Sequence, residues 1–328
     1  MRIIVTGAAG FVGMHLAQRF LRDGHDVLGI DGFTPYYEPA LKRARFAVLE
    51  QSPAFTGCEL MLEDAAAMKH VFADARADVV VHLAAQAGVR YSLEAPASYI
   101  DSNVVGTFNV LEAVRAAPVQ HLLMASTSSV YGANRAPFCE TDRADYPLSI
   151  YAATKKATED LAHSYAHLFG QPTTMMRFFT VYGPWYRPDM ALFKFTKAIL
   201  AGEPIDVYNG GRMRRDFTYI DDVVESLVRL VPATPRNAEV GCSPAAPYRV
   251  VNIAGGAPVE LEDYISAIER ATGRKAIRRD LPMQAGDMTE TVASVDLLEK
   301  LTGFVPKTRI ETGIDRFVDW YRAYYGLT

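Results

Sequence analysis

The stretch Arg2-Ile3-Ile4-Val5-Thr6-Gly7-Ala8-Ala9-Gly10-Phe11-Val12-Gly13 determines the expected fold. Ile3, Ile4 and Val5 form an apolar, β-branched run typical of a buried strand, and residues 11–22 have the apolar spacing of a helix. The three glycines between and within them permit a tight turn, a close backbone approach and close packing of the helix. Three glycines alone can simply make a turn. Their place between a strand and a helix favours a site for a dinucleotide pyrophosphate at the helix N-terminus.

Short apolar runs alternate with amphipathic stretches through the rest of the first half. We expect strands at Arg2–Thr6, Asp26–Asp31, Glu59–Leu62, Val79–Leu83, His121–Ala125 and Thr173–Phe178. We expect helices at Phe11–Arg22, Ala65–Phe72, Ser98–Ala116 and Ile150–Phe169. This alternation predicts an α/β fold, a Rossmann-type doubly wound parallel sheet with helices on both faces.

Proline and glycine residues break this pattern after residue 182. Shorter helices are expected at Met190–Ala201, Ile220–Leu230, Leu261–Thr272 and Ile310–Tyr324. A strand at Arg249–Ile253 is expected to return to the first sheet. We therefore predict an NAD-binding domain at residues 1–182, with this returning strand, and a smaller substrate-binding lobe mainly at residues 183–328. The lobe would cover the carboxyl ends of the strands, where ligands bind in such folds.

The composition of the 328 residues restricts the class of protein. The net charge is −4 without a basic run, so a nucleic-acid partner is not expected. Three cysteines lie far apart without C-x-x-C spacing, which favours a reducing, cytoplasmic location and argues against a structural metal site. The chain reaches the glycine-rich turn at once, so no signal peptide is expected. A membrane span is not expected either, because the sequence contains no run of about 18 apolar residues.

Asp31 ends the second expected strand, eighteen residues after Gly13. A carboxylate at this place accepts hydrogen bonds from the ribose hydroxyls of a dinucleotide and repels a 2′-phosphate, which favours NAD over NADP. The alternative is that Asp31 is only a turn residue. Arg43 and Arg45 fall on an expected helix, and we interpret them as surface charges.

Thr127 follows the strand at residues 121–125, and Tyr151 and Lys155 form a Y-x-x-x-K pair on an expected helix. Residues at i and i+4 of a helix share a face. An ammonium group beside a phenol favours the phenolate and lowers a pKa that is otherwise about 10. We therefore interpret Tyr151 as a base for a sugar or alcohol hydroxyl, with Thr127 on the same oxygen.

Together these features resemble the extended short-chain dehydrogenase/reductase family over nearly the whole chain. The resemblance also rests on His82-Leu83-Ala84-Ala85-Gln86, Asn103, Arg177-Phe178-Phe179-Thr180-Val181-Tyr182-Gly183-Pro184 and Arg215-Asp216-Phe217-Thr218-Tyr219-Ile220-Asp221-Asp222. The last two motifs are similar to those of nucleotide-sugar epimerases, dehydratases and decarboxylases. The resemblance implies bound NAD, a UDP-sugar substrate and a homodimer that forms through the helices at residues 98–116 and 150–169.

The resemblance further implies a role for individual residues. The catalytic residues would be Thr127, Tyr151 and Lys155. The NAD site would comprise Gly7, Gly10, Phe11, Val12, Gly13, Asp31, Leu62, Leu83, Ala84, Ala85, Asn103, Ser126, Tyr151 and Lys155. The nucleotide sugar would contact Arg90, Ser128, Ser129, Thr180, Arg187, Arg215 and Asp287. One departure is Met61, at a place where many relatives carry an Asp that contacts the adenine.

The residues after Thr127 discriminate among these relatives. Dehydratases carry Asp-Glu there, and decarboxylases usually place Glu at the position of Ser129. This chain has Ser128 and Ser129, with no carboxylate. The missing acids favour an enzyme that removes a hydride and returns it to the same carbon, which is an epimerase.

Three segments are similar to UDP-glucuronate 4-epimerases, namely residues 31–37, 41–45 and 183–191. This resemblance implies that Thr180 and Arg187 contact the C6 carboxylate of the sugar, with Arg90 as a second candidate cation. Alternatively, Arg187 pairs with Asp189 or faces solvent.

The implied activity is reversible C4 epimerisation of UDP-glucuronate to UDP-galacturonate through a 4-keto intermediate, with tightly bound NAD. Two alternatives within the same family are a 4-epimerase of a neutral or N-acetylated UDP-hexose and a UDP-glucuronate decarboxylase. An alternative from another class is a non-catalytic NAD-binding regulator. The intact Thr127, Tyr151 and Lys155 argue against the regulator, and the nucleotide base stays open.

Overall fold

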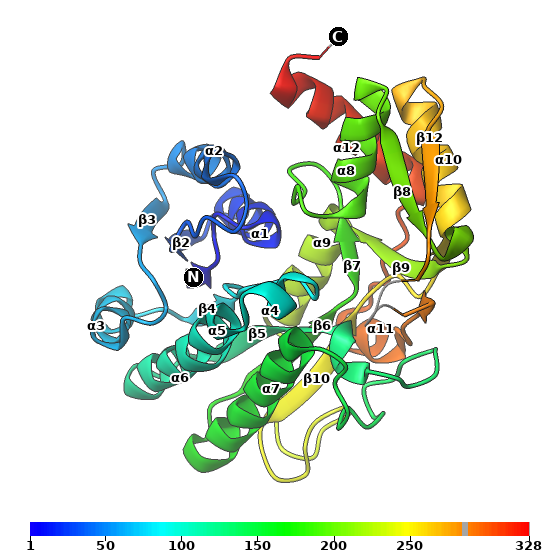
Figure 1. Ribbon diagram of the computed structural model, residues 1–328. Helices are drawn as coiled ribbons and strands as arrows, with labels where there is room; N and C mark the ends of the chain where they lie inside the picture. Colours follow the sequence, from blue (N-terminus) through cyan, green and yellow to red (C-terminus); the bar gives the residue numbers. More distant parts are fainter. Residues whose placement is uncertain (284–287, 328) are drawn as a thin grey trace.

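A seven-stranded parallel sheet lies at the centre of the computed structural model, which describes residues 1–283 and 288–327 (Figure 1). Its strands, in spatial order, are β10 (Tyr248–Ile253), β6 (Thr173–Phe178), β5 (His121–Thr127), β4 (Val79–His82), β1 (Arg2–Thr6), β2 (Asp26–Asp31) and β3 (Phe55–Glu59). Every pair of neighbours is parallel. The predicted doubly wound sheet is therefore confirmed. Its strand order reverses between β1 and β4, where a ligand crevice forms in such folds.

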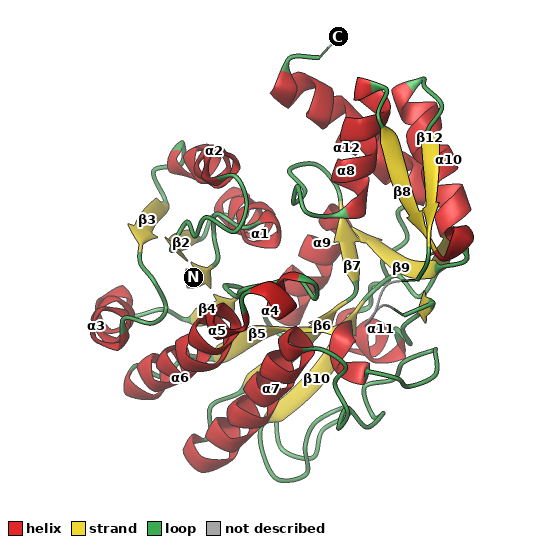
Figure 2. Ribbon diagram, viewed as in Figure 1, coloured by secondary structure: helices red, strands yellow, loops and turns green. Residues whose placement is uncertain are grey.

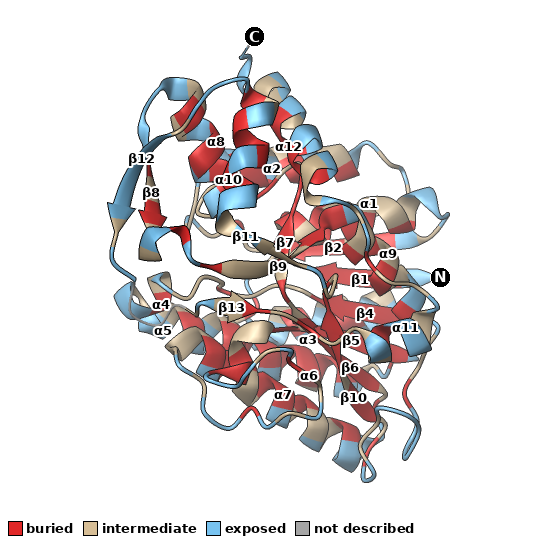
Figure 3. Cartoon of the chain, turned by 90° about the vertical axis from the view of Figure 1, so that its right-hand side faces the viewer, coloured by how far each residue is buried: buried red, intermediate tan, exposed pale blue. Residues whose placement is uncertain are grey.

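Side chains of each strand alternate between two hydrophobic cores, one on each face of the sheet. Ile3 and Val5 belong to the core that contains α1 (Phe11–Arg22) and α9 (Ile220–Leu230). Ile4 belongs to the core formed with α3 (Ala65–Ala75), α6 (Gly106–Ala116) and α7 (Ile150–Phe169). Because both faces are covered, all four residues of β4 are buried, and three consecutive valines precede His82. Figure 3 shows these central strands buried inside the molecule.

Helix α7 begins and ends at the residues that the sequence predicts. The Ser149 hydroxyl accepts a hydrogen bond of 3.1 Å from the Ala152 N–H, which caps the first turn. Gly170 ends the helix at φ 68°, a left-handed conformation that glycine adopts without a steric penalty. This helix carries Tyr151 and Lys155 in its first two turns, so its cap fixes where both side chains begin.

Two first-half predictions were wrong in position. The third strand is Phe55–Glu59 rather than Glu59–Leu62, because this edge strand is largely exposed and the apolar run that follows it lines the ligand cavity instead. The helix expected at residues 98–116 is divided. It consists of α5 (Pro96–Tyr99), a π-helical segment η1 (Ile100–Val105) and α6, and π-helical turns of this kind are common at functional sites.

The smaller lobe is built from short sheets and helices (Figure 2). One sheet joins β7 (Thr180–Tyr182), β9 (Arg214–Tyr219), β11 (Pro258–Glu260) and β13 (Glu290–Thr291), and a second pairs β8 (Pro204–Tyr208) with β12 (Ile277–Leu281). The helices are α8 (Ala191–Ala201), α10 (Leu261–Thr272) and α12 (Ile310–Tyr325).

Five further elements complete the described chain segments between these strands and helices. They are α2 (Pro39–Glu50), α4 (Tyr91–Glu94), η2 (Ser128–Tyr131), η3 (Asn209–Gly211) and α11 (Asp296–Thr302). Strand β10 returns from the second half of the chain and pairs with β6 of the large sheet. Among the described residues, no helix combines the length and the apolar character that crossing a membrane would require.

Candidate active site

A cavity of about 1100 Å³ lies at the carboxyl ends of the parallel strands and extends to the smaller lobe. Its wall includes the glycine-rich turn at one end and residues of β7, α8, β8 and β9 at the other. Pockets for single small ligands span roughly 300 to 1000 Å³. The cavity is thus large enough for more than one ligand of that size.

The glycine-rich turn leaves no room for side chains at its key positions. Gly7 has φ +75°, and a Cβ there would lie 2.8 Å from the backbone nitrogen of Ala84. A Cβ on Gly13 would lie 2.0 Å from the Gly7 carbonyl oxygen. Gly7, Gly10, Phe11, Val12 and Gly13 all line the cavity at the N-terminus of α1. Exposed backbone N–H groups at a helix N-terminus fit the pyrophosphate of a dinucleotide.

Asp31 lies on the cavity wall at the end of β2. Its carboxylate accepts hydrogen bonds from the backbone N–H groups of Ala9 at 3.0 Å and Phe33 at 2.9 Å. Burial raises the pKa of Asp31, while the Phe33 N–H and the Lys42 ammonium group act in the opposite direction. The carboxylate is thus fixed to the glycine-rich turn, and its second lone pairs can accept hydrogen bonds from a ribose.

Most of the other expected cofactor residues line the same cavity, namely Leu62, Leu83, Ala84, Ala85, Ser126, Tyr151 and Lys155. Ser126 nevertheless donates its hydroxyl hydrogen to buried Glu159 at 2.6 Å. Asn103 lies outside the lining and is fully buried. Its side chain bonds to both backbone groups of Gln86 and to the Thr154 hydroxyl, so it ties the loop after β4 to α7.

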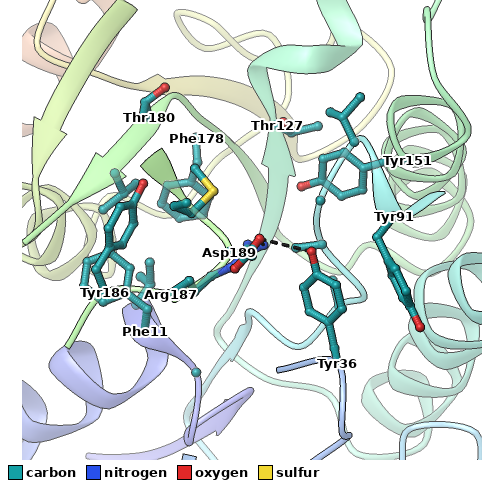
Figure 4. A pocket seen from close by; sticks show the side chains of 18 of the residues that line it. Phe11, Tyr36, Tyr91, Thr127, Tyr151, Phe178, Thr180, Tyr186, Arg187 and Asp189 are labelled. Carbon is teal, nitrogen blue, oxygen red and sulfur yellow. Dashed lines mark hydrogen bonds and ion pairs between the residues drawn. The ribbon is translucent and has the colours of Figure 1, made fainter. Parts of the chain in front are cut away.

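Thr127, Tyr151 and Lys155 all line the cavity, and Tyr151 and Lys155 lie one turn apart on α7. Thr127 ends β5, and its hydroxyl accepts a hydrogen bond of 3.2 Å from the Ser129 N–H. Figure 4 shows Thr127 beside Tyr151, whose hydroxyl points into the cavity. Two hydroxyl groups therefore face the space where a substrate oxygen would react.

The electrostatics of Tyr151 differ from the sequence-based interpretation, which placed its pKa below the ordinary value. Burial instead raises the pKa of Tyr151, and Thr127 and Arg187 offset only part of that effect. Burial also lowers the pKa of Lys155 to about 8, although Glu159 opposes this shift. The correction has a simple cause. Both groups are deeply buried, so desolvation acts against the charged form of each.

Arg187 lies in the loop after β7 and pairs with Asp189, as one of the two alternatives anticipated. Its Nε and Nη2 donate to the two carboxylate oxygens at 3.0 Å and 2.6 Å. Both side chains line the cavity, and so does Thr180 at the start of β7. In Figure 4 the Arg187–Asp189 pair projects between the strands of the lobe and Tyr151. Arg187 therefore both pairs with Asp189 and lines the cavity.

The remaining expected sugar and nucleotide contacts differ in their surroundings. Ser128 and Ser129 line the cavity beside Thr127. Arg90 also lines it and places its guanidinium 5.2 Å from the centre of the Tyr208 ring. Arg215 lines the wall and donates to the carbonyl oxygens of Arg214 at 2.9 Å and Met288 at 2.5 Å. Asp287 lies outside the described residues.

Arg45 is a residue behind the cavity wall whose role the sequence interpretation missed. It is not a surface charge, because its side chain is fully buried. It donates to the Tyr37 hydroxyl at 2.7 Å and to the carbonyl oxygens of Ala9 at 3.2 Å, Trp185 at 2.6 Å and Tyr186 at 3.3 Å. It thus joins the glycine-rich turn to the loop that bears Arg187. One signal was available, since Arg45 lies on the helix face of Leu41 and Leu49.

Arg43 lies two residues earlier and is an exposed surface charge, as the sequence indicates. It pairs with Glu59 at 2.7 Å. Lys42, which the sequence interpretation did not single out, lines the cavity, and so does Tyr36. Lys42 donates to the carbonyl and hydroxyl oxygens of Thr34 at 2.7 Å and 3.1 Å.

Comparisons with known proteins agree with this geometry. Residues 3–253 match the family described as "NAD dependent epimerase/dehydratase family". A probable UDP-glucuronate 4-epimerase from Rhizobium meliloti (strain 1021) is 56% identical over 99% of this chain and 98% of its own length. UDP-glucuronate 4-epimerase 3 from Arabidopsis thaliana is 45% identical over 98% of this chain and 77% of its own length.

Solved structures are similar over the same extent. The crystal structure of a UDP-glucuronic acid 4-epimerase from Bacillus cereus, in complex with UDP-glucuronic acid and NAD, has a TM-score of 0.90 and 32% identity. The match covers 99% of this chain and 100% of that one. A UDP-glucose 4-epimerase from Thermotoga maritima has a TM-score of 0.86 and 27% identity, over 99% and 100% of the two chains. By sequence, fold and site, this chain belongs to the NAD dependent epimerase/dehydratase family.

Proposed function

We propose that this protein is a UDP-glucuronate 4-epimerase, which interconverts UDP-glucuronate and UDP-galacturonate with tightly bound NAD. The observation that carries the proposal is one cavity that holds Thr127, Tyr151 and Lys155 at one side and Arg187 at the other. A dinucleotide site, a base and a guanidinium for a carboxylate are what this reaction requires. The similarity to UDP-glucuronate 4-epimerases supports the same activity.

The residues of the cavity fit NAD. Gly7, Gly10 and Gly13 leave space for a pyrophosphate at the start of α1, and Asp31 offers its carboxylate to a ribose. Phe11, Val12, Leu62, Leu83, Ala84 and Ala85 would complete the wall, with Lys155 and Tyr151 near the reacting end. When bound, NAD supplies the acceptor for the C4 hydride and its donor on return.

Tyr151 is the base in this proposal. Its phenolate would take the proton of the C4 hydroxyl, while Thr127 donates a hydrogen bond to the same oxygen. Arg187 already offsets part of the effect of burial on Tyr151, and the ammonium form of Lys155 adds positive charge one helical turn away. Proton return after the sugar has turned over would use the same hydroxyl.

The 4-keto sugar is a β-keto acid, which loses carbon dioxide when the bond to its carboxylate stands perpendicular to the ketone plane. Arg187 and Thr180 would hold the carboxylate away from that geometry. Ser128 and Ser129 supply no acid to protonate C5. Both features favour return of the hydride over decarboxylation. Arg215 would bind the diphosphate, since a guanidinium matches phosphate oxygens bidentately.

The test is to incubate the purified protein with UDP-glucuronate and to follow the products by proton NMR. We expect UDP-galacturonate, with the same equilibrium mixture reached from either sugar. A UDP-pentose as the main product would identify a decarboxylase. Turnover of UDP-glucose or its N-acetylated form, without turnover of UDP-glucuronate, would identify an epimerase of neutral sugars and overturn the proposal.

We also propose a homodimer that forms through η1, α6 and α7. Ile100, Val105 and Phe108 are between 41% and 48% exposed, and Phe169 at the end of α7 is 49% exposed. Such apolar side chains on neighbouring helices are costly in water and favour an interface. Sedimentation equilibrium should give twice the chain mass, and Phe108→Glu should shift it towards the monomer. A wild-type monomer at micromolar concentration would contradict the dimer.

The three cysteines are free thiols in the structure. Free thiols are typical of a reducing compartment, which supports the proposal of a cytoplasmic location. Fractionation of cells, followed by an immunoblot of the cytoplasmic fraction, would test it.

A further inference from the structure

The guanidinium of Arg187 is held along one of its two binding edges. Asp189 accepts from Nε at 3.0 Å and from Nη2 at 2.6 Å, so it occupies the edge formed by these two nitrogens. A guanidinium has a second edge, formed by Nη1 and the other hydrogen of Nη2, which also matches a carboxylate bidentately. Within residues 1–283 and 288–327, Nη1 of Arg187 donates no hydrogen bond. This second edge is available to a ligand.

Asp189 is itself held by a residue from another part of the chain. The Tyr36 hydroxyl, in the connection between β2 and α2, donates to Asp189 Oδ2 at 3.0 Å (Figure 4). Burial and the nearby Asp189 carboxylate raise the pKa of Tyr36, so it remains a hydrogen-bond donor. Burial opposes the charge on Asp189, but Arg187 outweighs it and lowers the pKa of that carboxyl. Asp189 is therefore an anion with both oxygens engaged.

The backbone beside Arg187 is fixed from the same connection. Arg45 donates to the carbonyl oxygens of Trp185 and Tyr186, the two residues that precede Arg187. The Arg187 guanidinium also lies over the Tyr36 ring, with its carbon 5.8 Å from the ring centre, and this contact adds a second restraint on the side chain. Both the loop and its side chain are thus held by residues 36–45, so Arg187 has little freedom to turn.

We propose that Asp189, supported by Tyr36, is a positioning residue that directs the second edge of Arg187 towards the carboxylate of the substrate. The inference rests on the proposed function, which places a uronate in this cavity. A carboxylate on that edge would lie nearer to Arg187 than to Asp189, so attraction exceeds repulsion at these separations. Without Asp189, the guanidinium could rotate, and the carboxylate would lose its bidentate partner and its fixed orientation.

This arrangement also gives a physical basis for choosing uronates over neutral hexoses. A neutral sugar carries a hydroxymethyl group at C6, which cannot occupy two guanidinium hydrogens with a matched charge. The advantage of the uronate depends on the orientation of Arg187 and not only on its charge. A lysine at this position would supply the charge without two hydrogen-bonding edges, so Arg187→Lys should lose the preference for uronates over neutral hexoses.

The central experiment compares Asp189→Asn with wild type in steady-state epimerisation. We expect the KM for UDP-glucuronate to rise about tenfold, because the substrate carboxylate would lose its charged hydrogen bonds to an oriented Arg187. The share of decarboxylated UDP-pentose should also rise, because the carboxylate is no longer held. Inhibition by UDP, which has no carboxylate, should stay unchanged. Tyr36→Phe should raise the KM in the same direction by about threefold, and Asp189→Glu should restore part of the loss.

Matched controls separate positioning from general damage. Asp23→Asn removes a carboxylate that pairs with Arg19 and lies outside the cavity lining. Tyr146→Phe changes a tyrosine that is 82% exposed. Both should keep the wild-type KM and product ratio. In an Arg187→Ala background, Asp189→Asn should have no further effect, because its action passes through Arg187.

Four results would overturn the inference. A lower KM in Asp189→Asn would show that Asp189 competes with the substrate for Arg187. An unchanged KM and product ratio would show that Asp189 has no role, and a parallel loss of UDP binding would show general damage. If Asp189→Asn raised the KM equally in the Arg187→Ala background, Asp189 would not act through Arg187. If wild type fails to convert UDP-glucuronate, the proposed function itself fails, which is distinguishable because it appears before any variant is made.

Discussion

Tyr151 shows how a single residue can be placed for chemistry while its surroundings oppose its ionisation. Its position on α7 follows from the Ser149 cap and the helical spacing to Lys155. Its raised pKa follows from burial, which the spacing of residues does not reveal. Ionisation of Tyr151 therefore depends on positive charge near its hydroxyl, and Arg187 supplies part of it.

The sharpest test at the scale of one residue is Tyr151→Phe. This change removes the hydroxyl that moves the proton and leaves the ring, so turnover should fall by about 10² to 10⁴. Binding of NAD and of UDP-glucuronate should persist, which titration calorimetry would measure. The exposed Tyr146→Phe is the control. If Tyr151→Phe kept more than a tenth of the wild-type rate, another group would have to be the base.

The β1–α1 turn shows what an element contributes that no single residue does. Its three glycines let α1 start against the sheet with its N-terminus open to the cavity. The α2 helix contributes in another way. It carries Arg45 inward and Arg43 outward, so one helix both links two cavity loops and covers an edge strand.

In the glycine-rich turn, Gly13→Ala should weaken NAD binding by more than about tenfold, because α1 must shift away from the pyrophosphate site. The reason is the Cβ contact of 2.0 Å with the Gly7 carbonyl oxygen, an atom that cannot move alone. Titration of cofactor-free protein with NAD would measure the change. Gly255→Ala is the matched control, since its Cβ would be 3.5 Å from its nearest neighbour. Equal affinities would contradict this account of the turn.

On α2, Arg45→Met should lower the free energy of unfolding by about 2 to 4 kcal/mol, because three carbonyl oxygens and a hydroxyl lose a buried donor. Urea unfolding would measure this loss. Arg43→Met, two residues away on the exposed face, should change the stability little. If the two variants were equally stable, Arg45 would not brace the loops.

Across the whole molecule, two buried histidines connect the parallel strands to their neighbours. His82 on β4 bonds to Thr6 of β1 at 2.7 Å and to Thr107 of α6 at 3.1 Å. His121 on β5 bonds to Thr174 of β6 at 2.8 Å and to the Val231 carbonyl at 2.9 Å. Burial lowers the pKa of His82 to about 3 and that of His121 to about 4.

These shifts predict how stability depends on pH. Between pH 6.5 and about 4 the unfolded chain binds protons at both histidines and the folded chain does not, so stability rises with pH in that window. Lowering the pH from 7 to 5 should cost about 2 kcal/mol for each histidine. Urea unfolding at both pH values would show it. His121→Gln should reduce the slope, whereas exposed His70→Asn should not. An unchanged slope in His121→Gln would contradict the assignment.

The sequence by itself determined the features that depend on near neighbours along the chain. The glycine-rich turn, the bounds of α1 and α7, and the pairing of Tyr151 with Lys155 all follow from spacing within a few residues. The missing acid after Thr127 indicated the type of reaction in the same local way. Helical periodicity and capping act over one or two turns, so a single sequence contains the information.

Only the tertiary structure decided the features that depend on distant partners. The exposed edge strand β3 carries too weak an apolar pattern to set its register. Arg45 is buried because carbonyl oxygens from residues 9, 185 and 186 meet it. Arg187 has one edge engaged because Asp189 is held by Tyr36, 153 positions earlier. The energy of a charged group depends on which groups surround it when water is excluded, and folding alone brings those groups together.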